Sequence, residues 1–172
     1  MRVGVNYFDN KDSFLSMEKD LSIIVNKMLN NDTLMKLLYY TQKDCLSAPA
    51  LTMMQKQSLV NKNILLVPKI EVDEKCPNYI VISIGNFKPN ETNPQFLDCE
   101  ITFDILCHAD HWNLGNFKLR PYRIAAEINS LFNNKKLTGI GTLLFMGTDD
   151  LVMDGDLMGV SIMYKAVHGI ED

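Results

Sequence analysis

The sequence lacks the features that mark a membrane protein, a secreted protein or a nucleic-acid-binding protein. No apolar run approaches the roughly 20 residues of a membrane-spanning helix, and residues 1–10 lack the apolar core of a signal peptide. A net charge of −4 gives no basic surface for wrapping nucleic acid. We therefore expect a chain made in the cytoplasm, with no membrane partner and no specific DNA binding.

Cysteine is scarce and does not have the spacing of a redox or metal-binding motif. The four cysteines, Cys45, Cys76, Cys99 and Cys107, form no CxxC pair and indicate no disulfide framework. Reduced thiols that lie in the core are the simplest interpretation of such a set.

Sequence motifs of known catalytic sites are also absent. The chain contains no Walker loop, Gly-x-Ser-x-Gly or His-Glu-x-x-His. Gly139-Ile-Gly141 opens an expected strand and does not lead into a helix, so it lacks the N–H donors that bind phosphate at a helix N-terminus. We therefore expect no catalytic residues, no metal ligands and no cofactor.

Helical periodicity occurs in the first third of the chain and in one later segment. Apolar residues at three- and four-residue steps predict helices over 13–30, 33–40 and 52–60. Pro121 suits the first turn of a further helix that runs to about Asn133.

Two of these helices carry recognisable start signals. Asp32 or Thr33 can cap the helix over 33–40. Thr52 followed by Gln55 is the pattern of a capping box, in which each residue hydrogen-bonds the backbone N–H of the other.

Strand patterns dominate the rest of the chain. Residues 98–107 alternate between apolar and polar, which predicts an antiparallel strand with one face on the core. Asp154-Gly155 is a strong hairpin-turn signal, whereas residues 85–95 are polar, contain two prolines and predict a long loop or projecting arm. The expected strands are 64–70 (at an edge, because of Pro68), 79–84, 98–107, 140–146, 151–153 and 157–167.

These elements predict a single α+β domain over residues 1–172. An N-terminal helical segment over 13–60 precedes a part over 63–168 that contains the sheet and one packed helix. Short hairpins favour a mainly antiparallel sheet of five to six strands with helices packed on one face. Such a sheet offers no topological switch point of the kind that binds cofactors in doubly wound folds.

The strongest candidate for a metal site is the segment FDILCHADHW, residues 103–112. If a strand ends there, Cys107 faces the core and His108 points the opposite way. Zinc needs three or four convergent ligands, and Cys99 lies roughly 27 Å from Cys107 along an extended strand. We interpret the segment as a strand end. A small metal-binding enzyme that uses Cys107 and His111 is the alternative.

Four aspartates form an acidic group near the end of the chain. Asp149, Asp150, Asp154 and Asp156 lack the residue order of a calcium-binding loop. Asp154 and Asp156 belong to the expected hairpin turn, where Asp is favoured for its turn chemistry. A solvated turn is one interpretation, and a weak cation site or a charge-repelling rim is the other.

Four segments carry a family resemblance, over residues 13–29 and about 96–168. They are FLSMEKDLSIIVNKML, CEITFDILCHADHW, RPYRIAAEINSLFN and a closing hairpin from GIGTLLFMGTDDLVMDGD to LMGVSIMYKAVHG. In their order and pattern they resemble the tail-terminator and tail-completion (head–tail joining) proteins of tailed bacteriophages.

The resemblance implies a non-enzymatic structural protein of the virion that forms a ring at the head–tail junction. Such a ring, a hexamer or alternatively a dodecamer, caps the tail tube, docks to the connector and other neck proteins, and lets DNA pass through its lumen. A connector-associated adaptor ring of the neck is the alternative within this class.

Three exposed regions are the expected subunit or partner contacts, and a plain solvated loop is the alternative interpretation for each. They are Phe87, Lys88, Pro89 and Asn90 in the long loop, His111 and Trp112 in the turn after the long strand, and Asp149, Asp150, Asp154 and Asp156 in the terminal hairpins.

Overall fold

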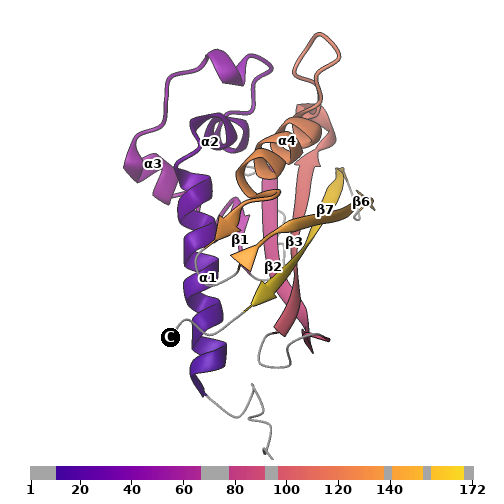
Figure 1. Ribbon diagram of the computed structural model, residues 1–172. Helices are drawn as coiled ribbons and strands as arrows, with labels where there is room; N and C mark the ends of the chain where they lie inside the picture. Colours follow the sequence, from indigo (N-terminus) through magenta and orange to yellow (C-terminus); the bar gives the residue numbers. More distant parts are fainter. Residues whose placement is uncertain (1–10, 67–77, 92–96, 138–140, 153–155, 169–172) are drawn as a thin grey trace, which may run out of the picture.

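The computed structural model describes residues 11–66, 78–91, 97–137, 141–152 and 156–168, which form a five-stranded sheet with helices packed against it (Figure 1). The helices are α1 (Lys11–Leu29), α2 (Asp32–Tyr39), α3 (Met53–Gln57) and α4 (Arg120–Phe132), with the short 3-10 turns η2 (Cys45–Ser47) and η3 (Ala109–His111). The strands, in spatial order, are β1 (Ile64–Leu65), β2 (Asn78–Pro89), β3 (Leu97–His108), β7 (Leu157–His168) and β6 (Leu144–Val152); β4 (Lys136–Leu137) and β5 (Gly141–Thr142) form a separate ladder.

The sheet is antiparallel except at one edge. β2, β3, β7 and β6 pair antiparallel in turn, whereas β1 pairs parallel with β2. The α+β class, the predominantly antiparallel sheet and the N-terminal helix are therefore confirmed. The edge position expected for the first strand is found for Ile64 and Leu65, and Pro68 lies outside the described residues.

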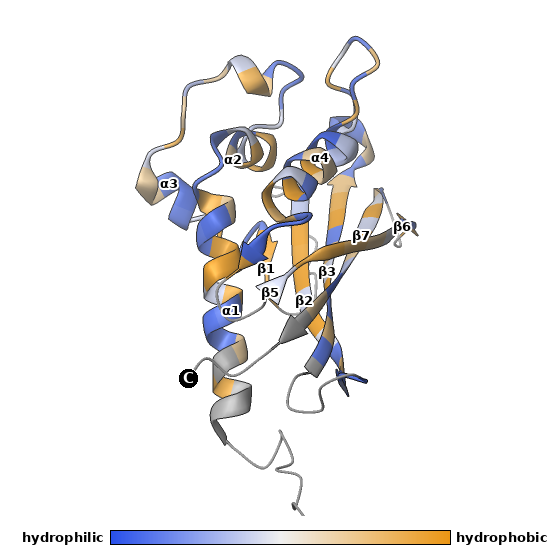
Figure 2. Cartoon of the chain, in the orientation of Figure 1, coloured by the Kyte–Doolittle hydropathy of each residue, from blue (hydrophilic) through white to orange (hydrophobic). Residues whose placement is uncertain are grey.

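One face of the sheet and the helices share a hydrophobic core. The alternating apolar residues of β3 point to this core, and Figure 2 shows the corresponding apolar stretches of β2 and β3 behind the helices. Phe103 of β3 lies at the centre: its ring stacks on Phe132 of α4 at 5.1 Å and meets Tyr164 of β7 edge-on at 5.9 Å. No helix in the described part of the chain is long and apolar enough to cross a membrane.

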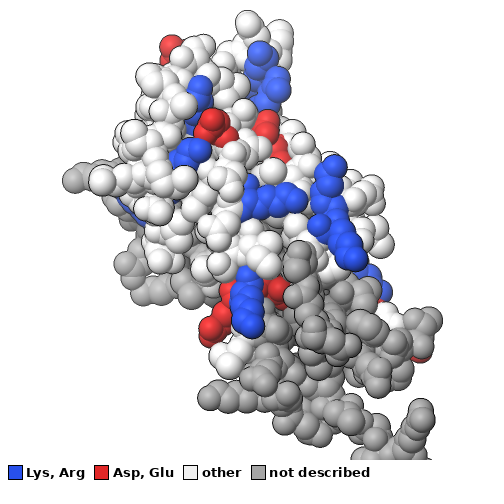
Figure 3. Space-filling model, turned by 60° about the vertical axis from the view of Figure 1, so that its left-hand side comes forward, with Lys and Arg blue, Asp and Glu red and all other residues white. Residues whose placement is uncertain are grey.

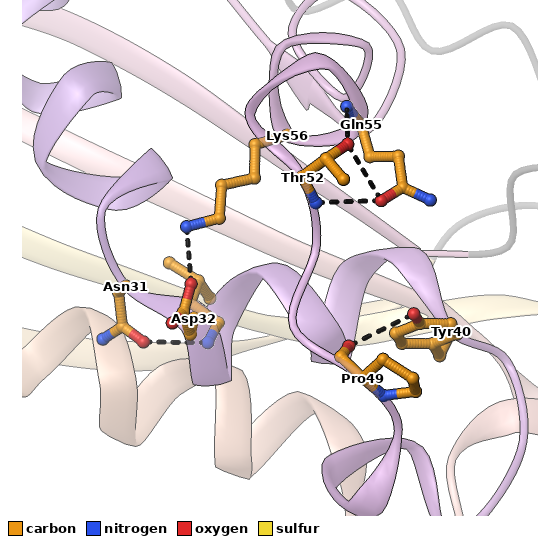
Figure 4. Close-up of polar contacts among 8 residues, drawn as sticks. Asn31, Asp32, Tyr40, Pro49, Thr52, Gln55 and Lys56 are labelled. Atoms are coloured by element: carbon orange, nitrogen blue, oxygen red, sulfur yellow. Dashed lines mark hydrogen bonds and ion pairs between the residues drawn. The ribbon is translucent and has the colours of Figure 1, made fainter.

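Asn31, and neither Asp32 nor Thr33, caps α2. The Asn31 side chain accepts a hydrogen bond from the Leu34 N–H at 2.9 Å (Figure 4). The Asp32 carboxylate is instead paired with the Lys56 ammonium of α3, and the hydrogen bond from Lys56 lowers the Asp32 pKa. The helix thus begins one residue earlier than expected because an Asn that follows α1 already supplies the cap.

The capping box at the start of α3 is confirmed. Thr52 accepts from the Gln55 N–H, and the Gln55 side chain accepts from the Thr52 N–H at 2.9 Å (Figure 4). The helix itself ends at Gln57, before the expected boundary.

The long loop or projecting arm expected over residues 85–95 is strand as far as Pro89, so any loop is shorter than expected; residues 92–95 lie outside the described residues. β2 continues to Pro89, where Lys88 pairs with Asp98 and Pro89 with Leu97 after a bulge that follows Gly85. Asn86 takes a positive φ of 54° within this bulge. The chain can therefore resume pairing after residues that otherwise favour turns.

The two short strands expected over 140–146 and 151–153 are replaced by the single strand β6. Asp149 and Asp150 lie within this strand, opposite Ser161 and Val160 of β7, and not between two separate strands as the expected boundaries placed them. Residues 138–140 and 153–155 lie outside the described residues, and Asp154 is among them.

Candidate interaction surfaces

The Cys-His pair at the end of β3 is split between the two sides of the sheet. Cys107 is fully buried in the core, and burial raises its thiol pKa to about 12. The His108 imidazole lies on the other side, 3.6 Å from the Asp110 carboxylate and 3.8 Å from that of Asp156. Because Cys107 lies on the core side of the sheet, its thiol does not converge with these groups around an ion, and burial makes it a poor nucleophile. No group of three or more His, Cys, Asp or Glu within the described residues is arranged to hold a metal.

His111 and Trp112, which follow β3, contribute to internal structure. Trp112 packs against the core and donates from its Nε1–H to the Cys107 carbonyl at 3.0 Å. The His111 carbonyl accepts from Arg120 Nε at 2.8 Å. Trp112 therefore covers the edge of the core, whereas the His111 side chain remains partly exposed.

Arg120 is an internal anchor that the sequence analysis missed. Its side chain is fully buried. Among the described residues, none of its hydrogen-bond partners is a carboxylate. The guanidinium instead sits where α2 ends, and a cation is favourable there because helix carbonyls point toward it. The acceptors, at 2.7–3.0 Å, are the carbonyls of Leu37, Tyr40, Thr41, Gln42 and His111.

The expected contact residues at the end of the β2–β3 hairpin divide into packed and exposed groups. Phe87 packs partly against the core, whereas Lys88 and Pro89 are exposed. Asn90 donates to the Asp98 carboxylate at 2.7 Å. Lys88 and Pro89 are thus the exposed members of this group of four.

Asp98 also pairs across the sheet with Lys165 of β7. Its carboxylate lies 2.6 Å from the Lys165 ammonium. The hydrogen bond from Lys165, followed by the one from Asn90, lowers the Asp98 pKa, and the same pair raises the Lys165 pKa.

An acidic edge, defined as Asp149, Asp150 and Asp156, lies at the β6–β7 end of the sheet. All three side chains are exposed. Residues 144–157 contain no Lys or Arg at all, so no cation from the same segment balances them. The structure therefore places the three described aspartates on the surface, two of them within a strand.

A basic surface, defined as Lys118, Arg123, Lys135 and Lys136, comes from the segment before β6. All four side chains are exposed, and residues 113–143 contain five basic residues against the single acid Glu127. Glu127 accepts a hydrogen bond from Asn31 at 2.9 Å. Figure 3 shows the face that comes forward when the α1 side is turned to the viewer, where Lys and Arg side chains are spread with Asp and Glu side chains among them.

The family of the chain follows from a match that spans most of it. A family model described as YomW matches residues 31–166, which is 136 of the 172 residues. The chain belongs to the YomW family. This family is phage-derived, so the bacteriophage origin inferred from the sequence is supported at that level.

The YomW match includes all the surfaces described above and begins after α1. Arg120 and the α2 carbonyls that it binds also fall within it. No curated protein matches the chain.

Proposed function

We propose that the chain is a structural protein of a phage virion that forms a ring at the head–tail junction, as a tail terminator. In this role it caps the tail tube, docks to the connector and performs no chemistry. The phage-derived family supports the setting of this proposal.

The observation that carries the proposal is that the basic surface and the acidic edge lie on different elements of the chain. A ring forms from heterologous contacts, in which one patch of each subunit meets a different patch of the next. Lys135 precedes β4 and Lys136 is its first residue, whereas Asp149 and Asp150 lie on the edge strand β6. Two patches of opposite sign on one chain are suited to such head-to-tail contact.

The charge balance also fits a ring through which DNA moves. A net charge of −4 disfavours tight, sequence-independent binding to phosphates, which would slow the passage of DNA. The acidic edge contributes three of the negative charges on the described surface.

Three measurements test the proposal. Negative-stain imaging and native mass measurement of the purified protein should show a closed ring; six subunits support a terminator and twelve a connector-associated adaptor ring. Labelled antibody on purified virions should mark the neck. Absence of the protein from virions, or label only on the capsid or tail fibres, would contradict the proposal.

A further inference from the structure

The loop that joins η3 to α4, residues 113–119, holds an aromatic ring in solvent. We name it the Phe117 loop; it is the coral segment that rises above α4 in Figure 1. The Phe117 side chain is 104 % exposed, more than any other large apolar side chain of the described residues. Gly115, Asn116 and Phe117 have φ angles of 83°, 49° and 59°. Such angles are rare for a bulky side chain, and strained backbone of this kind clusters at binding sites and switches.

Hydrogen bonds within the loop fix this conformation. Asn113 and Leu119 form an antiparallel bridge, and the Leu114 N–H donates to the Lys118 carbonyl at 2.9 Å. The Lys118 N–H donates to the Gly115 carbonyl at 2.9 Å, and the Gly115 N–H donates to the Asn113 side chain at 2.7 Å. The loop is thus a closed hairpin that presents Phe117 at its tip. An aromatic group that is already held in place loses little freedom on binding.

The first residues of β6 form a second exposed apolar surface. Leu144, Phe145 and Met146 are each about half exposed, at 50 %, 48 % and 53 %. β6 is an edge strand: within the described sheet it pairs with β7 alone. Its Phe145 N–H already donates to the Asn133 side chain at 3.3 Å, so a partner would meet the exposed apolar side chains here and not the backbone. Figure 2 shows this apolar start of β6 in front of the sheet.

The two apolar surfaces carry adjacent charges of opposite sign. Phe117 is followed by Lys118, with Arg123 one turn into α4. The apolar start of β6 is followed by Asp149 and Asp150 of the acidic edge. The first surface therefore presents an aromatic group beside cations. The second presents aliphatic and aromatic groups with anions on the side of Asp149; on its other side Leu144 lies opposite Lys165, whose charge is paired with Asp98.

We propose that the Phe117 loop of one copy docks on the first half of β6 of a second copy. Phe117 packs at the sheet edge against Phe145 and the bulge residue Met146, while Lys118 faces the acidic pair Asp149 and Asp150. This inference rests on the proposed function, because it names the contact that joins neighbouring subunits of the ring. The contact is heterologous, so each copy can dock on one neighbour and receive another.

The first test is assembly of point variants. A central aromatic contact of this kind typically accounts for a thirty-fold or larger change in Kd, so Phe117→Ser should raise the dissociation constant for assembly by about that factor or more. Met54→Ser is the matched control, because Met54 is 82 % exposed on α3 and lies in neither surface. Equal assembly of the Phe117→Ser variant and the wild-type chain would overturn the inference.

Charge reversal supplies a second, independent readout. Lys118→Glu should weaken assembly and reduce its salt dependence, because it removes an attraction to Asp149 and Asp150. Combining Lys118→Glu with Asp149→Lys and Asp150→Lys should restore assembly. Failure of the combined variant to assemble, in a chain whose urea midpoint is unchanged, would count against the proposed pairing.

A photo-reactive phenylalanine at position 117 separates this inference from the proposed function. Crosslinks to residues 144–146 of a second copy support the docking. Crosslinks only to another virion protein overturn the docking, even if antibody label marks the neck. A wild-type chain that stays monomeric at its highest soluble concentration overturns the docking as well. Self-crosslinks to residues 144–146 in a protein that is absent from virions keep the docking and overturn the proposed function.

Discussion

Phe117 and Arg120 are separated by only two residues, yet their environments are the reverse of what their side chains ordinarily adopt. The Arg120 guanidinium is fully buried and donates to five backbone carbonyls. The Phe117 ring is fully exposed on a backbone with positive φ. Charged side chains are almost never fully buried unless they are paired.

The contrast distinguishes a residue that stabilises the fold, Arg120, from a residue whose side chain is exposed to a partner, Phe117. Arg120 joins α4 to the end of α2, so its hydrogen bonds fix where the Phe117 loop ends. The loop projects from the surface, and the Phe117 ring at its tip is fully exposed among the described residues. A rigid base beneath an exposed aromatic group is the arrangement expected of a binding element placed on a fixed scaffold.

The largest effect should come from removing the anchor. Arg120→Met leaves five carbonyls without their donor, and each unsatisfied buried polar group costs about 1–3 kcal/mol; some acceptors will reach water, so we expect a loss of about 3–5 kcal/mol in the free energy of unfolding. Urea denaturation measures it. Arg123→Met, at an exposed position of the same helix, should change stability by less than about 0.5 kcal/mol. Similar losses for both variants would contradict the anchoring role.

The next effect compares a central strand with the edge strand on which we propose docking. In β7, a Cβ at Gly159 would lie 1.7 Å from the Ile105 carbonyl oxygen, whereas a Cβ at Gly147 of β6 has nothing within 4 Å. The backbone of β3 cannot move away easily, so Gly159→Ala should cost about 2–3 kcal/mol. Gly147→Ala should be neutral or stabilise by up to about 1 kcal/mol. Thermal unfolding of both variants checks this, and a larger loss at Gly147 would show that the edge is not open.

The contrast between Arg120 and Phe117 also marks the limit of what the sequence predicts. The alternation of residues 98–107 places Cys107 in the core because side chains of a strand alternate between faces, and the structure agrees. The capping box at Thr52 is equally local and was predicted for the same reason. Arg120 was missed because its acceptors come mostly from residues 37–42, about 80 positions away, and no local pattern signals them.

Errors at the strand ends have a different physical cause. Residues 85–89 contain Gly, Asn and Pro, which favour turns, but pairing with β3 overrides that preference through a bulge. Asp149 and Asp150 are likewise poor strand formers, yet they pair along β7 at the sheet edge. The exposure of Phe117 had no sequence signal, because an isolated Phe between polar residues is as consistent with a buried position.

A smaller effect concerns the strain in the Phe117 loop. Asn accepts a left-handed conformation more readily than Phe does, so Phe117→Asn should stabilise the monomer by about 0.5–1 kcal/mol. Urea unfolding at low protein concentration measures this without a contribution from assembly. The same variant should assemble less well, so that stability and assembly change in opposite directions. A loss of monomer stability would instead show that the Phe117 side chain packs against other residues of its own chain.

The smallest effect is the pH dependence contributed by the pair of Asp98 and Lys165, which lies at the other end of β3 from Arg120. The Asp98 pKa is lowered from its ordinary 3.8, so the pair stabilises the fold above that pH and the contribution is lost as pH falls below it. The Lys165 pKa is raised from 10.5, so the contribution persists below that pH and is lost at higher pH. Asp98→Asn should therefore lower the urea midpoint between these limits and converge with the wild-type chain in acid.

Because the Lys165 side chain is 47 % exposed, salt should reduce the difference in urea midpoint between Asp98→Asn and the wild-type chain. Asp149→Asn makes the same change of charge at an exposed edge position, so an equal midpoint shift in that variant would mean that net charge, and not the cross-strand pair, is responsible.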